Sequence, residues 1–325
     1  MSNKLRVLSL FSGIGAFEKA LTNLNISFDL VGFSEIDDRA IKSYCAIHNI
    51  GKSMNLGDIT QIDTSQLDNI DILTHGSPCQ DFSVSGLAKL GGDEGSGTRS
   101  SLMWNTVKIV QDTLPKVVIW ENVKGVLQKN NIHNYEKYVD TLTQLGYTNY
   151  TQIVNSKYFG VAQDRDRIFV VSILTGIHDT FEFPTGNPTP PTLKEQLDDL
   201  VDESYYIHNI RNCRRTKKYI QFDPKGSGHN SQQYRLYYLE GQMCTLPNRN
   251  SGDKAQVLLS TEPYIGRKIT ECEAWRLMGF TTEDFNKAKA TGQTKGSLYG
   301  QAGNSIVVPV AEAIFKQLFK YVTFN

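Results

Sequence analysis

Several features that identify whole classes of protein are missing from this sequence. No stretch of its 325 residues is long and apolar enough to span a membrane, and Met1 to Lys4 shows no signal-peptide pattern. Cysteine is scarce, and its five copies have irregular spacings that indicate neither a disulfide framework nor a zinc site. The net charge of zero indicates no partner by itself. We therefore expect a cytoplasmic protein without membrane contact, in whose reducing surroundings a free thiol persists.

The apolar residues that are present predict a packed α/β core. Hydrophobic residues make up 39% of the chain, and short apolar runs alternate with segments of helical periodicity up to Leu174. We expect strands over residues 4–10, 28–33, 70–73, 116–120, 148–154 and 168–174, and helices over 18–25, 102–114 and 135–145. This alternation predicts a mostly parallel, doubly wound sheet.

A glycine-containing turn, Phe11–Gly15, follows the first expected strand and precedes a helix. Strand, glycine turn and helix open a nucleotide-binding unit, in which the helix N-terminus and the close approach of the backbone favour a polar ligand. Glu35 follows Gly15 by 20 residues, where such folds place an acid that accepts from ribose hydroxyls. Glu18 stands where the dinucleotide fingerprint requires Gly or Ala, which favours a nucleoside ligand over NAD. Alternatively, Gly13 and Gly15 simply shape a turn.

Cys79 lies in a second turn, Gly76–Ser83, at the end of the strand over residues 70–73. Ligands and chemistry gather at the C-terminal ends of strands in open α/β sheets, so that Cys79 is well placed to act as a nucleophile. A small apolar residue filling the turn is an equal alternative on these residues alone. The following residues, 84–98, lack periodicity and predict a loop, and loops of that length are usually functional.

The pattern changes after Phe183, where four prolines form a linker. Residues 204–264 then show short aromatic-rich runs between turn residues, which predicts a small, irregular, partly β domain. Between residues 204 and 268, eleven Lys and Arg stand against four acids, and Arg211, Arg214, Arg215, Lys217 and Lys218 crowd together. Such a cluster is typical either of a phosphate-contacting surface or of a solvated face. Helical character returns over 269–278, and residues 300–321 end in an apolar helix that we expect to pack on the large sheet.

Six blocks of the sequence, taken together, resemble the cytosine-C5 DNA methyltransferase family. They occur in the family order and spread over nearly the whole chain outside the variable segment. The blocks are Phe11–Gly15, Gly76–Gln80, Glu121–Val123, Gln163–Arg167, Arg267–Thr270 with Glu273–Gly279, and Gly300–Ser305. The resemblance implies the S-adenosylmethionine-dependent methyltransferase fold, a Rossmann-like doubly wound sheet. It implies a catalytic and cofactor-binding domain over residues 1–188 plus 299–325, and a target-recognition domain with a hinge over 189–298.

The family chemistry assigns catalytic roles to four residues of this sequence. Cys79 would attack cytosine C6 as a thiolate, which makes C5 electron-rich. Glu121 would hold cytosine N3 and the exocyclic amine, and Arg167 would contact the O2 side with Arg165 close by. Without the resemblance, a structural ion pair between Glu121 and Arg167 would be an alternative. The base that removes the C5 proton is not identifiable, and a water is the candidate by resemblance.

The implied cofactor is S-adenosyl-L-methionine, with S-adenosyl-L-homocysteine as the product and no metal. The resemblance places Phe11 on the adenine face, Glu35 on the ribose hydroxyls and Asp58 on the adenine amine. The backbone of Gly13 and Gly15 would approach the methionine part. The other residues expected at this site are Ile36, Ile59, Pro78, Asn304 and Ser305.

The implied partner is double-stranded DNA, from which the target cytosine must be flipped out of the helix. The loop Ser83–Arg99 would close over it, with Ser85 entering the gap. Thr245 and Leu246 resemble the short signature of the family's recognition region, and we expect Gln232, Arg235, Thr245 and Arg249 to contact DNA. The compact length resembles monomeric bacterial or phage enzymes of restriction-modification systems, whose cognate endonuclease is a functional rather than a physical partner.

Three other functions compete with this interpretation. A tRNA cytosine-C5 methyltransferase of the same family would carry a Cys-Phe-Thr motif, which this sequence lacks. An inactive regulatory DNA-binding homologue would not need Cys79, Glu121 and Arg167 together. A NAD-dependent oxidoreductase would need the third glycine of its fingerprint. The sequence does not reveal which DNA site, and which cytosine in it, is recognised.

Overall fold

The chain forms two compact units. The computed structural model describes residues 4–78, 92–177, 180–208, 210–224, 226, 228, 232–247 and 255–324. The first unit comprises Met1–Val154, Asp166–Thr185 and Val310–Asn325, and the second comprises Asn155–Arg165 and Gly186–Pro309. The chain therefore passes from the second unit back to the first between Arg165 and Asp166.

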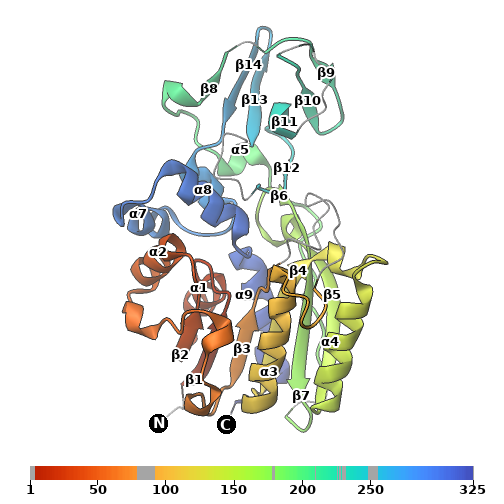
Figure 1. Ribbon diagram of the computed structural model, residues 1–325. Coiled ribbons are helices and arrows are strands. Elements are labelled where there is room, and N and C mark those ends of the chain that lie inside the picture. The colour runs from red at the N-terminus through yellow and green to blue at the C-terminus, as the bar shows by residue number, and fades with distance from the viewer. Residues whose placement is uncertain are drawn as a thin grey trace. The chain divides into compact units, whose positions relative to one another are not determined.

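The first unit alternates strands and helices along most of its length (Figure 1). Its elements are β1 (Leu5–Leu10), α1 (Ala16–Asn23), β2 (Phe28–Ser34), α2 (Asp38–His48), β3 (Ile72–His75), α3 (Met103–Thr113), β4 (Val117–Val123), α4 (Ile132–Gln144), β5 (Tyr147–Asn155), β7 (Asp166–Leu174) and α9 (Val308–Tyr321). Short 3-10 turns lie at Lys52–Met54, Ile59–Gln61, Thr64–Gln66, Arg99–Leu102 and Lys124–Leu127.

The sheet of the first unit has the strand order β2-β1-β3-β4-β7-β5. Neighbours from β2 to β4 pair in parallel, whereas β7 runs antiparallel to β4. The predicted mostly parallel α/β sheet is therefore confirmed. Because parallel strands end at one edge, the turns after β1, β2, β3 and β4 gather there, as ligand sites in open α/β sheets require.

Helices cover both faces of this sheet, which is why its central strands β1, β3, β4 and β7 are buried over most of their length. One core cluster joins Leu8 and Trp120 of the strands to Val107 of α3 and Leu142 of α4. In Figure 1, α3 and α4 lie in front of the sheet and α9 lies behind it. Phe315 of α9 meets Phe17 of α1 at 6.0 Å between ring centroids. The C-terminal helix thus packs on the large sheet, as predicted.

The second unit combines a mixed sheet with short helices. Its elements are β6 (Gln163–Asp164), α5 (Leu193–Gln196), β8 (Tyr206–Ile207), β9 (Arg214–Arg215), β10 (Tyr219–Gln221), β11 (Arg235–Tyr238), β12 (Met243–Cys244), β13 (Gln256–Thr261), β14 (Tyr264–Lys268), α6 (Glu271–Arg276), α7 (Thr282–Ala290) and α8 (Lys295–Asn304), with 3-10 turns at Ser156–Phe159, Glu203–Tyr205 and Gln232–Tyr234. The sheet order is β8-β14-β13-β11-β10-β9, and β6 pairs separately with β12.

A buried ion pair joins this sheet to the helices of the second unit. Arg267 of β14 donates from Nη1 and Nη2 to the two carboxylate oxygens of Glu273 at 2.9 and 2.7 Å. Glu273 also completes the capping box of α6 with Thr270. Burial alone would raise the pKa of Glu273, but the hydrogen bonds from Arg267 and the backbone lower it, so that the pair stays charged.

Two elements differ from the sequence-based expectation. The apolar stretch predicted to end in one helix contains two, α8 and α9, separated at residues 305–307. Pro309 stands in the first turn of α9, where a missing backbone N–H costs nothing but a preceding helix cannot continue. Strand β4 runs to Val123, so that Glu121 lies inside the strand rather than after it.

Within the part of the chain that the structure describes, no helix is long and apolar enough to cross a membrane. Four described cysteines, Cys45, Cys213, Cys244 and Cys272, are free thiols. The same residues contain no group of three or more His, Cys, Asp or Glu side chains that could hold a metal ion.

His75, at the end of β3, makes the first unit sensitive to acid. Its ring is fully buried against Trp120, and burial lowers its pKa from 6.5 to about 3. Because His75 binds a proton more readily in the unfolded chain than in the folded one, its protonation favours unfolding. The free energy of unfolding is therefore at its full value above pH 6.5 and falls as the pH drops towards 3. We expect a loss of about 1.4 kcal/mol per pH unit in that interval. Urea unfolding of His75→Phe should show a shallower pH dependence there, and an unchanged slope would contradict this assignment.

Candidate active site

The turn after β3 is fixed by two side chains of β4. Trp120 donates from Nε1 to Ser77 Oγ at 3.1 Å, and Asn122 donates from Nδ2 to the Ser77 carbonyl at 3.2 Å. Residues two apart in a strand point to the same face, so that both reach the same turn. Ser77 is buried and directly precedes Pro78. Cys79 and Ser85 lie outside the described residues.

Glu121, which lies between Trp120 and Asn122 in sequence, forms a nearly buried ion pair with Arg167. Glu121 Oε1 lies 3.1 Å from Arg167 Nε, with the two side chains 11% and 17% exposed. They come from the antiparallel strands β4 and β7, in which Val123 pairs with Arg167 and Glu121 with Phe169. Arg167 also donates from Nη1 to the Asp166 carbonyl at 2.7 Å, and Asp166 accepts from Lys124 at 2.7 Å. A carboxylate and a guanidinium are thus held side by side at the strand ends, where they can bind the polar edge of a heterocycle.

Arg165 has different partners, although it is two residues from Arg167. It lies in the second unit and is 3% exposed. Its Nη1 donates to the Gly303 carbonyl at 3.2 Å and its Nη2 to the Ser305 carbonyl at 2.8 Å. Asn304, the last residue of α8, is exposed, and Ser305 Oγ donates to the Ile306 carbonyl at 3.0 Å. Arg165 therefore fixes the backbone that carries Asn304 and Ser305.

The glycine turn after β1 is tied to Glu35 at the end of β2. The Glu35 carboxylate accepts from the backbone N–H groups of Gly13 at 2.9 Å, Ile36 at 2.8 Å and Asp37 at 2.9 Å. Phe11 and Gly13 have φ values of +53° and +56°, so that the turn needs left-handed residues. Ile36 beside it is 73% exposed, which is unusual for so large an apolar side chain.

Asn55, which sequence reasoning missed, joins Glu35 to the next expected binding segment. Its Oδ1 accepts from the N–H groups of Glu35 and Gly57, each at 3.2 Å, and its Nδ2 donates to the Glu35 carbonyl at 3.0 Å. Asp58 follows Gly57 and caps a 3-10 turn by accepting from Thr60 N at 2.9 Å, whereas Ile59 is buried. The only sequence signal for Asn55 is its position before a Leu-Gly turn.

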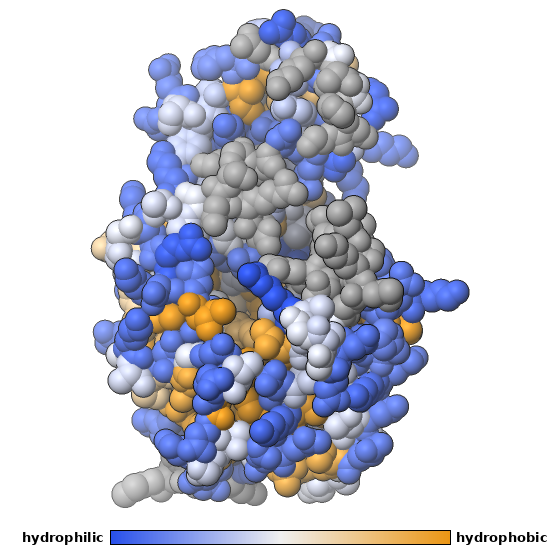
Figure 2. Space-filling view, viewed as in Figure 1, coloured by the Kyte–Doolittle hydropathy of each residue, from blue (hydrophilic) through white to orange (hydrophobic). Residues whose placement is uncertain are grey.

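Three of the residues expected to contact DNA lie close to Cys244 and Tyr219 in the second unit. Gln232 donates from Nε2 to Cys244 Sγ at 2.6 Å and to the Thr245 carbonyl at 3.4 Å. The Arg235 guanidinium lies 4.8 Å from the centre of the Tyr219 ring. Arg249, the fourth, lies outside the described residues. Figure 2 shows mainly hydrophilic side chains over the sheet of this unit, which suits a polar partner.

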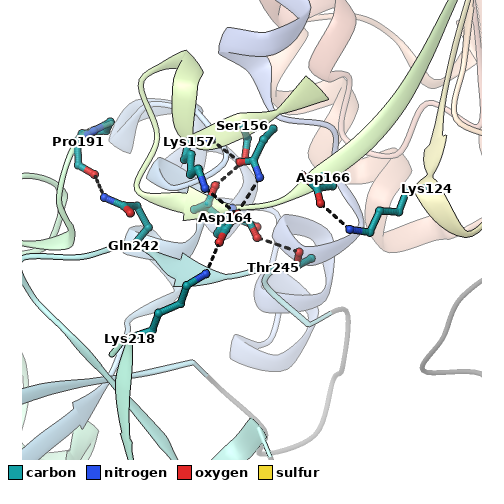
Figure 3. A network of polar contacts seen from close by, with 11 residues as sticks. Lys124, Ser156, Lys157, Asp164, Asp166, Pro191, Lys218, Gln242 and Thr245 are labelled. Carbon is teal, nitrogen blue, oxygen red and sulfur yellow. Dashed lines mark hydrogen bonds and ion pairs between the residues drawn. The ribbon is translucent and has the colours of Figure 1, made fainter. Parts of the chain in front are cut away.

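Asp164, which sequence reasoning did not single out, is the centre of a polar network in the second unit (Figure 3). Its carboxylate accepts from Asn155 at 2.7 Å, Lys218 at 2.8 Å and Lys157 at 3.3 Å. Burial alone would raise the pKa of Asp164, but these hydrogen bonds outweigh burial and lower it to about 2. Lys218, one of the clustered basic residues for which either a phosphate-contacting surface or a solvated face was predicted, is therefore paired with an acid.

Comparisons with known proteins agree on one family. Residues 5–320 match the family model described as C-5 cytosine-specific DNA methylase. The chain is 34% identical over 374 residues to the type II methyltransferase M2.ScrFI of Lactococcus lactis subsp. cremoris, with 97% of this chain and 99% of that protein covered. It is 30% identical over 441 residues to the orphan methyltransferase M.SPBetaI of Bacillus phage SPbeta, with coverage of 97% and 98%.

Solved structures share the fold at lower sequence identity. The Entamoeba histolytica methyltransferase EhMeth superposes with a TM-score of 0.75 at 19% identity, covering 98% of this chain and 99% of that one. The S. pombe Dnmt2 methyltransferase superposes with a TM-score of 0.73 at 19% identity and the same coverage.

The glycine turn offers a test of local packing. A Cβ on Gly15 would lie 2.1 Å from His48 Nε2 and 2.7 Å from Tyr44 Cε2, at φ +79°. A Cβ on Gly13 would meet nothing within 4 Å, at φ +56°. We expect Gly13→Ala to cost about 1 kcal/mol of unfolding free energy from backbone strain and Gly15→Ala about 1–3 kcal/mol more from the overlap. Urea denaturation measures the free energy of unfolding of both variants. Equal losses would show that His48 and Tyr44 of α2 move away from the added Cβ without a loss of stability.

Proposed function

Because the chain belongs to the C-5 cytosine-specific DNA methylase family, we propose that it methylates C5 of a cytosine in a specific duplex DNA site, with S-adenosyl-L-methionine as the methyl donor. The observation that carries this proposal is the Glu121–Arg167 ion pair near the end of β4, where the sequence neighbours of Glu121, Trp120 and Asn122, hold Ser77. The enzyme is thus a DNA (cytosine-5-)-methyltransferase, and its residue roles are proposed below.

The residues around the glycine turn fit the proposed methyl donor. Glu35 is oriented by three backbone N–H groups, and its carboxylate has lone pairs left to accept from ribose hydroxyls. The exposed Ile36 offers an apolar surface to a flat base, and space remains above Gly13. When bound, S-adenosyl-L-methionine supplies an electrophilic methyl group. We assign Phe11 and Asp58 to the adenine, Gly13, Gly15 and Pro78 to the methionine side, and Ile59, Asn304 and Ser305 to supporting contacts.

Cys79 is proposed as the nucleophile. Its thiolate forms a bond to cytosine C6, and the displaced electron pair makes C5 nucleophilic enough to take the methyl group. Loss of the C5 proton to a base then returns the electron pair to the ring, and the Cys79–C6 bond breaks. The covalent path replaces one difficult step by two easier ones.

Glu121 and Arg167 are proposed to hold the cytosine through these steps. Glu121 binds N3 and the exocyclic amine, and a proton at N3 offsets the charge that the thiolate pushes into the ring. Arg167 binds O2 and, through its ion pair, fixes the Glu121 carboxylate. Arg165 acts by positioning, because its guanidinium holds the backbone of Gly303 and Ser305.

The proposed division of labour assigns catalysis and cofactor binding to residues 1–188 plus 299–325, and target recognition to 189–298. The cytosine must leave the duplex to be reached, and the loop Ser83–Arg99 with Ser85 is proposed to fill the gap. Gln232, Arg235, Thr245 and Arg249 are proposed to read the site, with neighbouring basic residues on phosphates. The names of the relatives, type II and phage orphan methyltransferases, support a restriction-modification origin with or without an endonuclease.

Cys79→Ser should abolish methyl transfer while leaving DNA binding within about threefold of wild type, because the hydroxyl is a far weaker nucleophile. Transfer of labelled methyl groups and a mobility-shift assay measure the two properties. A duplex with 5-fluorocytosine at the target should trap wild-type enzyme covalently, since no C5 proton can leave, and should not trap Cys79→Ser. Turnover by the serine variant, or no trapping by an active wild-type preparation, would exclude this mechanism.

Glu35→Ala should weaken binding of S-adenosyl-L-homocysteine by about 10- to 100-fold, the usual loss for hydrogen bonds to a charged group. Asp37→Ala is the matched control: Asp37 caps α2 and pairs with Arg39, but has no assigned ligand contact. We expect it to lower stability and leave affinity unchanged. Isothermal titration calorimetry distinguishes the two, and wild-type affinity in Glu35→Ala would remove Glu35 from the cofactor site.

A further inference from the structure

The Asp164 carboxylate joins two parts of the second unit that are distant in sequence. On one side it accepts from Asn155 and Lys157, which belong to the segment between β5 and β6. On the other it accepts from Lys218, 54 residues away. Figure 3 shows the side chains of Lys157 and Lys218 converging on the Asp164 carboxylate. The Asp164 side chain is 27% exposed and that of Lys157 22%, whereas that of Lys218 is 68% exposed, so that the carboxylate is partly shielded from water and the Lys218 ammonium is not.

The same segment also holds Thr245, one of the residues proposed to contact DNA. Asp164 pairs with Cys244 in the short ladder of β6 and β12, and its carbonyl accepts from Thr245 Oγ1 at 3.5 Å. Gln163 Oε1 accepts from Leu246 N at 3.0 Å. Because Gln232 donates to Cys244 and to the Thr245 carbonyl, its position also depends on this ladder.

Lys218 extends the connection to Arg235. It lies in the turn between β9 and β10, where Thr216 Oγ1 accepts from the N–H groups of Lys218 at 3.2 Å and Tyr219 at 3.0 Å. The adjacent Tyr219 ring lies beneath the Arg235 guanidinium. An ion pair that fixes Lys218 therefore also restrains the surface on which Arg235 rests.

We propose that Asp164 is a positioning residue for sequence discrimination. Its carboxylate holds Lys218, beside the Tyr219 ring on which Arg235 rests, and its backbone carbonyl holds Thr245, so that Arg235 and Thr245 keep one arrangement towards DNA. The inference rests on the proposed function. It also gives Lys218 a different role: its ion pair with Asp164 fixes part of the target-recognition domain, and Lys218 does not contact a DNA phosphate. This structural role is called a tether below.

The two roles of Lys218 predict opposite effects of removing the Asp164 charge. If Lys218 bound a phosphate, Asp164→Asn would strengthen binding to all duplexes by removing a repulsive charge, and Lys218→Gln would lower the slope of log K against log salt by about 0.9. If Lys218 is a tether, both substitutions loosen the same contact. Each then lowers discrimination, and the double variant is no worse than either single variant.

The test begins with wild-type enzyme expressed in cells, whose target site is mapped by methylation-sensitive sequencing. kcat/KM is then measured for that site and for single-mismatch duplexes, together with the KM for S-adenosyl-L-methionine. We expect Asp164→Asn, Lys218→Gln and their double variant each to lower the cognate-to-mismatch ratio by about tenfold, with kcat on the cognate site and the cofactor KM within about threefold of wild type.

Asp166→Asn is the matched control, because Asp166 lies in the same motif but its carboxylate pairs with Lys124 of the first unit, at 2.7 Å. We expect it to keep the wild-type ratio. A wild-type ratio in Asp164→Asn, additive losses in the double variant, or tighter binding to every duplex would overturn the inference. Absence of DNA methylation by wild-type enzyme would instead overturn the proposed function.

Discussion

The requirement that buried polar side chains find partners determines the structure around residues 163–167. Each of these five consecutive polar side chains bonds to a different part of the chain. Gln163 binds Leu246 and Leu277, Asp164 binds Lys218, Arg165 binds Gly303 and Ser305, Asp166 binds Lys124, and Arg167 pairs with Glu121. The partners of Gln163, Asp164 and Arg165 lie in the second unit, whereas those of Asp166 and Arg167 lie in the first unit. Loss of Gln163, Arg165 or Arg167, whose partners are buried, would be costly, whereas Lys218 and Lys124, which pair with Asp164 and Asp166, are exposed to water.

The proposed cofactor site depends on a second group of such contacts. The glycine turn, the end of β2 and the Gly57–Asp58 turn are separate in sequence, and Glu35 and Asn55 hold them together. Since nearly all these bonds use backbone N–H groups, the site depends more on strand ends and turns than on side-chain variety. The parallel pairing of β1, β2 and β3 brings those ends together.

Most of the fold could be predicted because apolar periodicity reports local burial. Strands β1, β2, β5 and β7 and helices α3 and α4 agree with the predicted ranges to within about three residues. The division of the C-terminal stretch into α8 and α9 was missed because the apolar residues Ile306 and Val307 run directly into α9. Periodicity also could not show that Glu121 lies inside β4, since strand length depends on pairing with β7. Such pairing is a long-range property.

The sequence by itself determined the family and the α/β class, and it is the basis on which a nucleophile, an acid and a guanidinium are proposed. It did so because each motif is a local run whose chemistry is set by residue type. Only the tertiary structure decided the partners: Arg165 with the backbone of residues 303–305, Arg167 with Glu121, and Lys218 with Asp164. Neighbouring residues of one motif contact different parts of the chain, and residues 54 positions apart in sequence contact each other. The reason is that packing of the fold sets which residues are close in space.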